Sequence, residues 1–267
     1  MVACGNRHCN SNGQLILENN GRQKNKQQNP AQGANAKGSP RSLPMAHAKP
    51  FRHRLIGVIA SIVFCILTLA VFELALRVAG YGYTTAFFVK HPAAGPANVV
   101  ENQQFAWRFM PVTLARRPEP IVLPIQKPEK TCRIFVFGES AAIGDPAPAF
   151  GFSRILDVLL RERYPSIRFE VVNTAFTAIN SHVIVPIARD AQRFGGDFWL
   201  VYMDNNEVIG PFGSGTVFGK QSPPLPVIRA SLAIKTTKIG QLLDAAAQRL
   251  VPSPEARKGW GGMDMFL

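Results

Sequence analysis

A run of eighteen uncharged, mostly apolar residues at positions 55–72 constrains this 267-residue chain more than any other feature. Extended to residue 76, the run is about 22 residues long, which at about 1.5 Å per helical residue spans the roughly 30 Å hydrocarbon core of a bilayer. A buried core helix is the alternative, but a helix of this length in a soluble core normally has a polar face. The run therefore predicts one transmembrane helix over residues 55–76.

The flanks of the run predict its orientation. Arg52 and Arg54 precede it, and the positive-inside rule places such a flank in the cytoplasm and the following domain on the other side of the membrane. A cleaved signal peptide is the rival interpretation; its apolar region would be about 7–15 residues long and would end in an Ala-x-Ala-like site, which residues 76–80 match poorly. We expect Glu73 to reach the membrane interface or to pair with Arg77, four residues further on.

Residues 1–54 form a basic tail of different composition. They are rich in Asn, Gln, Gly and Ser and hold nine Lys or Arg residues against one acid, so most of the net charge of +13 belongs to them. Such a stretch buries too little apolar surface to offset its ordering entropy, and we expect a disordered cytoplasmic tail, which a start at Met45 would remove. The rest of the chain is nearly balanced in charge and has no basic stripe with interleaved aromatic residues, so nucleic acid is not an expected partner.

The cysteines predict neither a disulfide framework nor a metal site. Cys4 and Cys9 lie in the tail, Cys65 lies inside the apolar run, and Cys132 directly precedes a predicted strand. This spacing does not match a zinc site, and no cofactor is expected.

The part of the chain after the membrane divides into a Pro-rich connector at 77–130, with a short strand, and an α/β domain at 131–267. Apolar runs typical of buried strands alternate in the domain with helical patterns, and a further helical pattern follows them. The strands are expected at 133–137, 169–173 and 198–202, and the helices at 152–164, 181–194 and 228–250. This alternation predicts a parallel sheet with its ligand site at the carboxyl ends of the strands.

Small or polar residues follow each of the three predicted strands. The first strand is followed by Gly138-Glu139-Ser140, the second ends at Asn173, and Asn206 follows the third. A serine directly after a strand, with helix N–H groups beside it, suits a nucleophile, and an asparagine at a neighbouring strand end suits an oxyanion donor. The alternative is that these residues only form turns and cap helices.

As an ordered set, these segments resemble the SGNH hydrolases, the GDSL-type lipases and esterases. The family's Gly-Asp-Ser block resembles residues 138–140, its Asn and Gly block resembles Asn173 and Ala178, and its Gly-x-Asn-Asp block resembles residues 204–207. The likeness covers residues 131–219, and the residues around the three blocks resemble those of a membrane-anchored subgroup of the family. It implies a three-layer, flavodoxin-like parallel sheet.

The resemblance also implies a function. Ser140 would be the nucleophile, and its N–H, the N–H of Ala178 and the side chain of Asn206 would form the oxyanion hole for acyl transfer from an ester to water. The ester would be a lipid or an acylated glycan. Three residues depart from the family pattern: Ala178 replaces Gly, which we expect to be tolerated if its φ is negative; Glu139 replaces Asp; and Asp204 replaces Gly, which would disfavour an oxyanion if its carboxylate pointed inward.

The family's general base is a histidine in a late Asp-x-x-His block, which this sequence does not show. Only His182 follows Ser140, and its context is that of a surface or capping histidine. We therefore expect the catalytic domain to be incomplete at its C-terminus. Three hypotheses follow: a membrane-anchored ester hydrolase, a catalytically inactive relative that binds a ligand or protein beside the membrane, and an anchoring protein whose domain has no site.

Overall fold

A computed structural model describes residues 51–250 and 261. The tail interpretation of residues 1–50, and the end of the predicted domain apart from Gly261, lie outside the described residues. The α-helices are α1 (Phe51–Val78), α2 (Ser140–Ile143), α3 (Phe152–Arg163), α4 (Ser181–Ala191), α5 (Leu225–Ile234) and α6 (Lys238–Leu250). The strands are β1 (Phe88–Val89), β2 (Asn98–Glu101), β3 (Val122–Pro124), β4 (Thr131–Gly138), β5 (Arg168–Asn173) and β6 (Phe198–Tyr202). The 3-10 helices are η1 (Pro92–Ala94), η2 (Phe105–Arg108), η3 (Pro148–Phe150) and η4 (Gln192–Phe194).

The first helix, α1, is long and apolar enough to cross a membrane. Its candidate span is the 27 residues Arg52–Val78, which at about 1.5 Å per residue makes about 40 Å. None of its most apolar stretch is buried in the described structure, which excludes the buried-core interpretation there. Near its end, Glu73 forms an ion pair with Arg77 at 2.8 Å, one of the two arrangements expected from the sequence.

The segment between α1 and the main sheet contributes a small antiparallel sheet of its own, in the order β1-β2-β3. Its aromatic side chains are buried in the same core cluster as the main sheet, and Phe87 packs edge-to-face on Phe105 with ring centroids 5.2 Å apart. The buried side chain of Asn102 donates hydrogen bonds to the carbonyls of Thr84 and Ala86 at 2.7 and 2.8 Å. The segment predicted as a Pro-rich connector with one strand therefore has three strands and part of the core.

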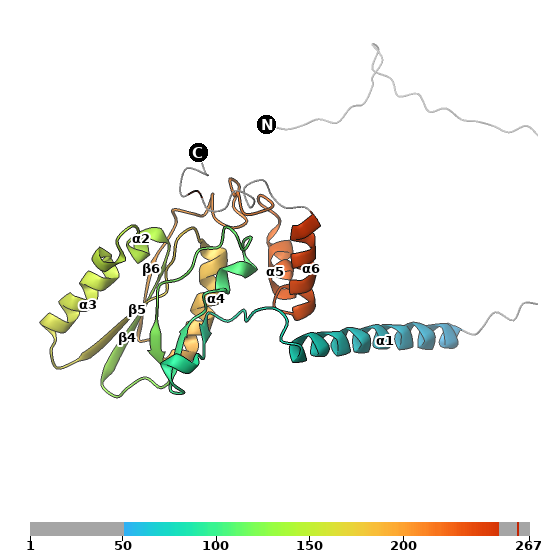
Figure 1. The fold of residues 1–267 in the computed structure, drawn as a ribbon, viewed down its shortest axis with the longest axis horizontal. Helices are drawn as coiled ribbons and strands as arrows, with labels where there is room; N and C mark the ends of the chain where they lie inside the picture. The colour runs from blue at the N-terminus through green and yellow to red at the C-terminus, as the bar shows by residue number, and fades with distance from the viewer. Residues whose placement is uncertain (1–50, 251–260, 262–267) are drawn as a thin grey trace, which may run out of the picture. The chain divides into compact units, whose positions relative to one another are not determined.

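The main sheet is parallel and has the order β5-β4-β6, so the first strand in the chain lies at its centre. The α/β content and the parallel sheet are confirmed. In Figure 1, α2 and α3 lie on one side of this sheet and α4 lies on the other, as right-handed crossovers to opposite edges require. The register pairs Val136 with Asn173 and Gly138 with Tyr202, which brings the carboxyl ends of the three strands together.

A buried arginine lies in the central strand β4. Arg133 is fully buried, and its guanidinium donates to Glu170 on β5 at 2.8 Å and to the carbonyl of Phe194 at 2.5 Å. Burial of a charge is costly unless it is paired and hydrogen-bonded, and both partners are supplied here by elements on either side of the strand.

The helical pattern predicted at 228–250 forms two helices, α5 and α6, with a turn between them. The Thr236 and Thr237 hydroxyls donate to the carbonyls of Ala233 and Ile234 at 2.6 and 2.8 Å, which satisfies the end of α5. Thr237 also accepts from the N–H of Gly240 at 3.0 Å, as a helix-capping residue does. A Cβ at Gly240 would lie 2.0 Å from the carbonyl oxygen of Ile234, so this close turn requires glycine.

The edge strand β6 is exposed on both faces. Within the described part of the chain it pairs with β4 alone, and its large apolar residues are 43–60% exposed at Phe198, Trp199, Val201 and Tyr202. Parallel sheets are normally covered on both faces, and exposed apolar edges are prone to pair with other chains.

Candidate active site

Ser140 is the first residue of α2, at the carboxyl end of the central strand β4. The intervening turn is tight: a Cβ at Gly138 would lie 2.3 Å from both the carbonyl oxygen of Tyr202 and the Cβ of Ala142, so only glycine fits. Ser140 is half-buried, and the first N–H groups of a helix have no partner within the helix. The position therefore presents a hydroxyl and free N–H groups together.

The residue before Ser140 connects its turn to the loop after β6. Glu139 is fully buried, and its carboxylate accepts hydrogen bonds from the N–H of Asn206 at 3.0 Å and of Asp204 at 3.4 Å. Burial raises the pKa of the Glu139 carboxyl above its ordinary value of 4.5, because the charged form loses hydration; these two hydrogen bonds act in the opposite direction and the Glu207 carboxylate adds to the rise. Through these hydrogen bonds Glu139 positions the loop after β6.

Asn206 has a buried side-chain amide that lacks a partner. The residue is 5% exposed, and its Nδ2 atom has no hydrogen-bond acceptor among the described residues. An unsatisfied buried amide costs about 1–3 kcal/mol, so such a group calls for an explanation. A donor kept free for a ligand or a developing negative charge is one such explanation.

Asn180 is a neighbouring polar residue that was not singled out from the sequence. It is fully buried at the start of α4, and its Nδ2 donates to the carbonyl of Pro211 at 2.9 Å. Its Oδ1 atom has no donor among the described residues. A Cβ built on Gly210 would contact both the Asn180 side chain and the carbonyl of Asn206, so both asparagines lie close to that glycine. The signal was available, since Asn180 directly precedes a helical pattern.

Asn173 joins the end of β5 to α2 and α3. Its Nδ2 donates to the carbonyl of Ala142 at 2.9 Å and to the Ser153 hydroxyl at 2.8 Å, and its Oδ1 accepts from the N–H of Ala175 at 3.0 Å. The two N–H bonds of Nδ2 and the Oδ1 atom are thereby all used to hold the loop, which makes Asn173 a structural residue of the site.

Ala178 is buried beside these loops but has an unexpected backbone conformation. Its φ is +65°, so the condition under which alanine was expected to be tolerated here, a negative φ, is not met. This left-handed region costs a residue with a Cβ roughly 1–2 kcal/mol, which explains why glycine is the more natural residue at such a turn. The N–H of Ala178 has no acceptor among the described residues, and the turn is held by the hydrogen bond from the Thr177 hydroxyl to Asp145 at 2.8 Å.

Asp204 and Glu207, the two acidic residues of the segment 204–207, are not directed at a common centre. Asp204 is exposed, with a φ of +134°, and it takes part in the site through its backbone N–H. Glu207 caps α4, because its carboxylate accepts from both the N–H and the hydroxyl of Ser181 at 2.8 Å. Exposure of Asp204 to solvent reduces its effect on a developing oxyanion, since water screens its charge.

His182 lies near the start of α4 and is half-buried. Its ring packs edge-to-face on Phe212 with the centroids 5.6 Å apart. No hydrogen bond from the imidazole to Ser140 is recorded in the described structure, and no other histidine follows Ser140 in the sequence. The geometry therefore supplies a serine, free N–H groups and an amide donor, but identifies no general base among the described residues.

A shallow cavity, largely open to solvent and about 640 Å³ in volume, lies beside the serine turn. It is lined by Ala141, directly after Ser140, by Gly144 and Asp145, and by Phe152 and Tyr202, whose rings lie 5.8 Å apart. Its volume is within the range of small-molecule sites, about 300–1,000 Å³, and its walls are mixed apolar and polar. A substrate bound there would lie next to the residue that follows the candidate nucleophile.

Comparisons of the chain with protein-family models, with curated proteins and with solved structures found no match. The interpretation of the site therefore depends on its residues and their geometry.

Proposed function

We propose that the domain after α1 is an SGNH-type acyl hydrolase in which Ser140 attacks an ester carbonyl. The observation that carries this proposal is the unpartnered buried amide of Asn206, on a loop that Glu139 holds beside the serine turn. The N–H groups of Ser140 and Ala178 would complete the oxyanion hole with this amide.

The proposed fold is the three-layer, flavodoxin-like architecture that this family shares. The sheet order β5-β4-β6 supports it, because a flavodoxin-like sheet also places its first strand between its second and third. The helices on both faces of the sheet support it as well.

The proposed reaction has two halves. The Ser140 Oγ atom forms a bond to the acyl carbon, the ester C–O bond breaks, and the alcohol leaves with the proton from the serine. Water then attacks the acyl-enzyme, the acid leaves, and the serine regains its proton. Both halves need a general base, without which a serine hydroxyl is a weak nucleophile.

The absence of an identified base among the described residues favours a second candidate function, a binding module. In that case the cavity beside Ala141 and the free amide of Asn206 would hold an ester-bearing ligand without turnover. A lipid or an acylated glycan is the proposed ligand class in both cases.

The proposed location is a single-pass membrane anchor with a cytoplasmic N-terminus and the domain outside the cytoplasm. The basic residues Arg52 and Arg54 at the start of α1 support this orientation. Protease added to the outer face of intact cells should digest the domain and spare the tail; digestion of the tail alone would reverse the orientation.

A fluorophosphonate probe tests the hydrolase proposal, because it modifies only an activated serine. If a general base that is not among the described residues activates Ser140, the full chain in membranes should be labelled and Ser140→Ala should not. Asn206→Ala should be labelled about 100-fold more slowly, as for removal of one oxyanion donor. Ser214→Ala, a change at an exposed serine in the loop after β6, is the matched control and should label normally. Absence of labelling in the unmodified chain, or labelling that persists in Ser140→Ala, would contradict the proposal, and retained binding of an acylated glycan would then favour the binding module.

A further inference from the structure

A second cavity, of about 480 Å³, lies between the helices α5 and α6 and the segment that follows η2. Its walls include the apolar side chains of Phe109, Met110, Phe212, Phe218 and Ile228. Val112 and Val227 also line it and are 50% and 54% exposed, which places its mouth beside them. A cavity of this size with apolar walls is typical of a small-molecule site.

Three of the polar side chains that line this cavity bond to one another. Lys235 forms an ion pair with Asp244 at 2.9 Å, and Gln248 donates to the second oxygen of the Asp244 carboxylate at 2.8 Å. These groups therefore need no polar ligand to satisfy them. Apolar side chains make up most of the wall, so the cavity is better suited to a flexible apolar chain than to a sugar, which would lose hydration over that wall.

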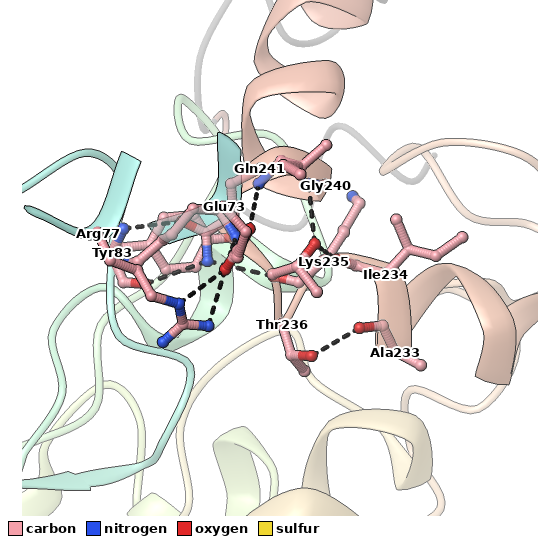
Figure 2. A network of polar contacts seen from close by, with 12 residues as sticks. Glu73, Arg77, Tyr83, Ala233, Ile234, Lys235, Thr236, Gly240 and Gln241 are labelled. Carbon is pink, nitrogen blue, oxygen red and sulfur yellow. Dashed lines mark hydrogen bonds and ion pairs between the residues drawn. The ribbon is translucent and has the colours of Figure 1, made fainter. Parts of the chain in front are cut away.

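The helix that forms one wall of the cavity is attached directly to the anchor helix (Figure 2). The two carboxylate oxygens of Glu73, in the last turns of α1, accept hydrogen bonds from the N–H groups of Lys238 and Ile239, each at 2.9 Å. These are the first residues of α6, whose N–H groups have no partner within the helix, so an anion there is favourable. The start of α6 is thus fixed at the end of the apolar span.

Gln241, in the first turn of α6, connects the end of the anchor helix to the cavity. The side-chain amide of Gln241 donates to the carbonyl of Tyr83, five residues beyond α1, at 3.1 Å and to the carbonyl of Lys235 at 3.2 Å. Lys235 is also one of the residues that line the cavity. Gln241 therefore links Lys235, which lines the cavity, to Tyr83, which follows the apolar helix. In the membrane-anchored arrangement proposed above, this point lies at the bilayer surface, where acyl chains are the abundant apolar ligands.

We propose that this cavity binds a long-chain acyl group taken from the membrane, as a free fatty acid or as one chain of a phospholipid. The chain enters beside Val112 and Val227 and lies among the apolar side chains between α5 and α6. The site is distinct from the serine turn and binds its ligand whether or not Ser140 performs hydrolysis.

Photocrosslinking tests this proposal with the full chain in lipid nanodiscs. Two probes are used in separate samples, a diazirine-bearing palmitic acid and a phosphatidylcholine with a diazirine in one acyl chain, and labelled peptides are identified by mass spectrometry. We expect labelling of cavity residues in addition to α1, and the two probes distinguish a free fatty acid from a lipid chain. Val227→Trp narrows the mouth and should lower cavity labelling by about tenfold, equivalent to about 1.4 kcal/mol of lost affinity.

The controls separate this site from the bilayer and from the hydrolase proposal. Labelling of α1 should be unchanged in Val227→Trp, and Val158→Trp, a change at a half-exposed valine on α3, should leave cavity labelling intact. Val112→Trp narrows the same mouth from the other wall, outside α5, and should lower cavity labelling as Val227→Trp does. It keeps the test valid where Val227→Trp disturbs the folding of α5. Ser140→Ala should bind the probes normally, so failure of hydrolysis does not count against the cavity. Labelling confined to α1 with both probes, or cavity labelling unchanged in both mouth variants, would overturn the proposal.

Discussion

The carboxylate of Glu139 accepts a hydrogen bond from the backbone N–H of Asn206 at 3.0 Å, across the carboxyl ends of two neighbouring parallel strands. This bond joins the residue before the candidate nucleophile to the residue whose amide is free. The two candidate groups are thereby held by one buried side chain, so their separation depends on the protonation and length of Glu139.

Glu139 should make the stability of the domain depend on pH. Its pKa is raised in the folded chain by burial, so the folded state holds the proton more tightly than the unfolded state does. The contribution of Glu139 to the free energy of unfolding should therefore fall as pH rises from 4.5 through the raised pKa, by at most about 1.4 kcal/mol per pH unit. Urea unfolding of the detergent-solubilised chain and of Glu139→Gln over this pH range isolates the effect. The unfolding free energy of the unmodified chain minus that of the variant should fall with pH, and a constant or rising value would contradict the prediction.

Substitutions at Ala178 test the left-handed backbone conformation in the loop after β5. Glycine adopts a φ of +65° without strain, but loses the small buried methyl group and more chain entropy, so Ala178→Gly should change the unfolding free energy by no more than about 1 kcal/mol. Ala178→Val adds a β-branched side chain in the same conformation and should cost at least about 2 kcal/mol. Thermal unfolding of the two variants measures this, and equal effects would show that the left-handed conformation is not present.

The stability of the contact between α1 and the start of α6 should depend on Glu73 far more than on Arg77. Glu73→Ala removes the acceptor for two N–H groups at the start of α6 and should lower the local stability of that helix by about 1–2 kcal/mol. Arg77→Ala removes only a partly exposed ion pair and should cost less than about 0.5 kcal/mol. Hydrogen exchange at Lys238 and Ile239 in detergent or nanodiscs compares the two, and similar exchange rates in both variants would contradict the capping role.

The exposed edge of the main sheet should make the chain self-associate. Val201 on β6 is 60% exposed, and a lysine on an edge strand opposes pairing with another strand. Val201→Lys should therefore reduce the oligomeric fraction of the detergent-solubilised chain severalfold, as measured by light scattering during gel filtration. Val158→Lys on α3, a site 46% exposed, is the matched control, and an equal reduction there would point to general charge repulsion.

Local patterns in the sequence were sufficient for α1 and for the three strands of the main sheet. The apolar run before Glu73 predicts α1, and the alternation of apolar runs with helical patterns predicts the parallel sheet, because burial and periodicity act within a few turns or strands. The turn at residues 235–237, which divides the last helical pattern, depends on threonine hydroxyls and a close backbone approach at Gly240 that periodicity does not report.

The site was predictable only as a set of positions at strand ends. Ser140 and Asn206 could be named because each follows a strand, and Ala178 through the family resemblance, but the sequence does not show that Glu139 joins two of these loops or that Ala178 has a positive φ. The bond from Asn206 to Glu139 joins segments more than 60 residues apart, as does the attachment of α6 to Glu73. The sequence by itself determined a helix long and apolar enough to cross a membrane, the α/β class of the fold and the candidate residues. Only the tertiary structure decided which buried groups find partners among the described residues and which, like the Asn206 amide, do not.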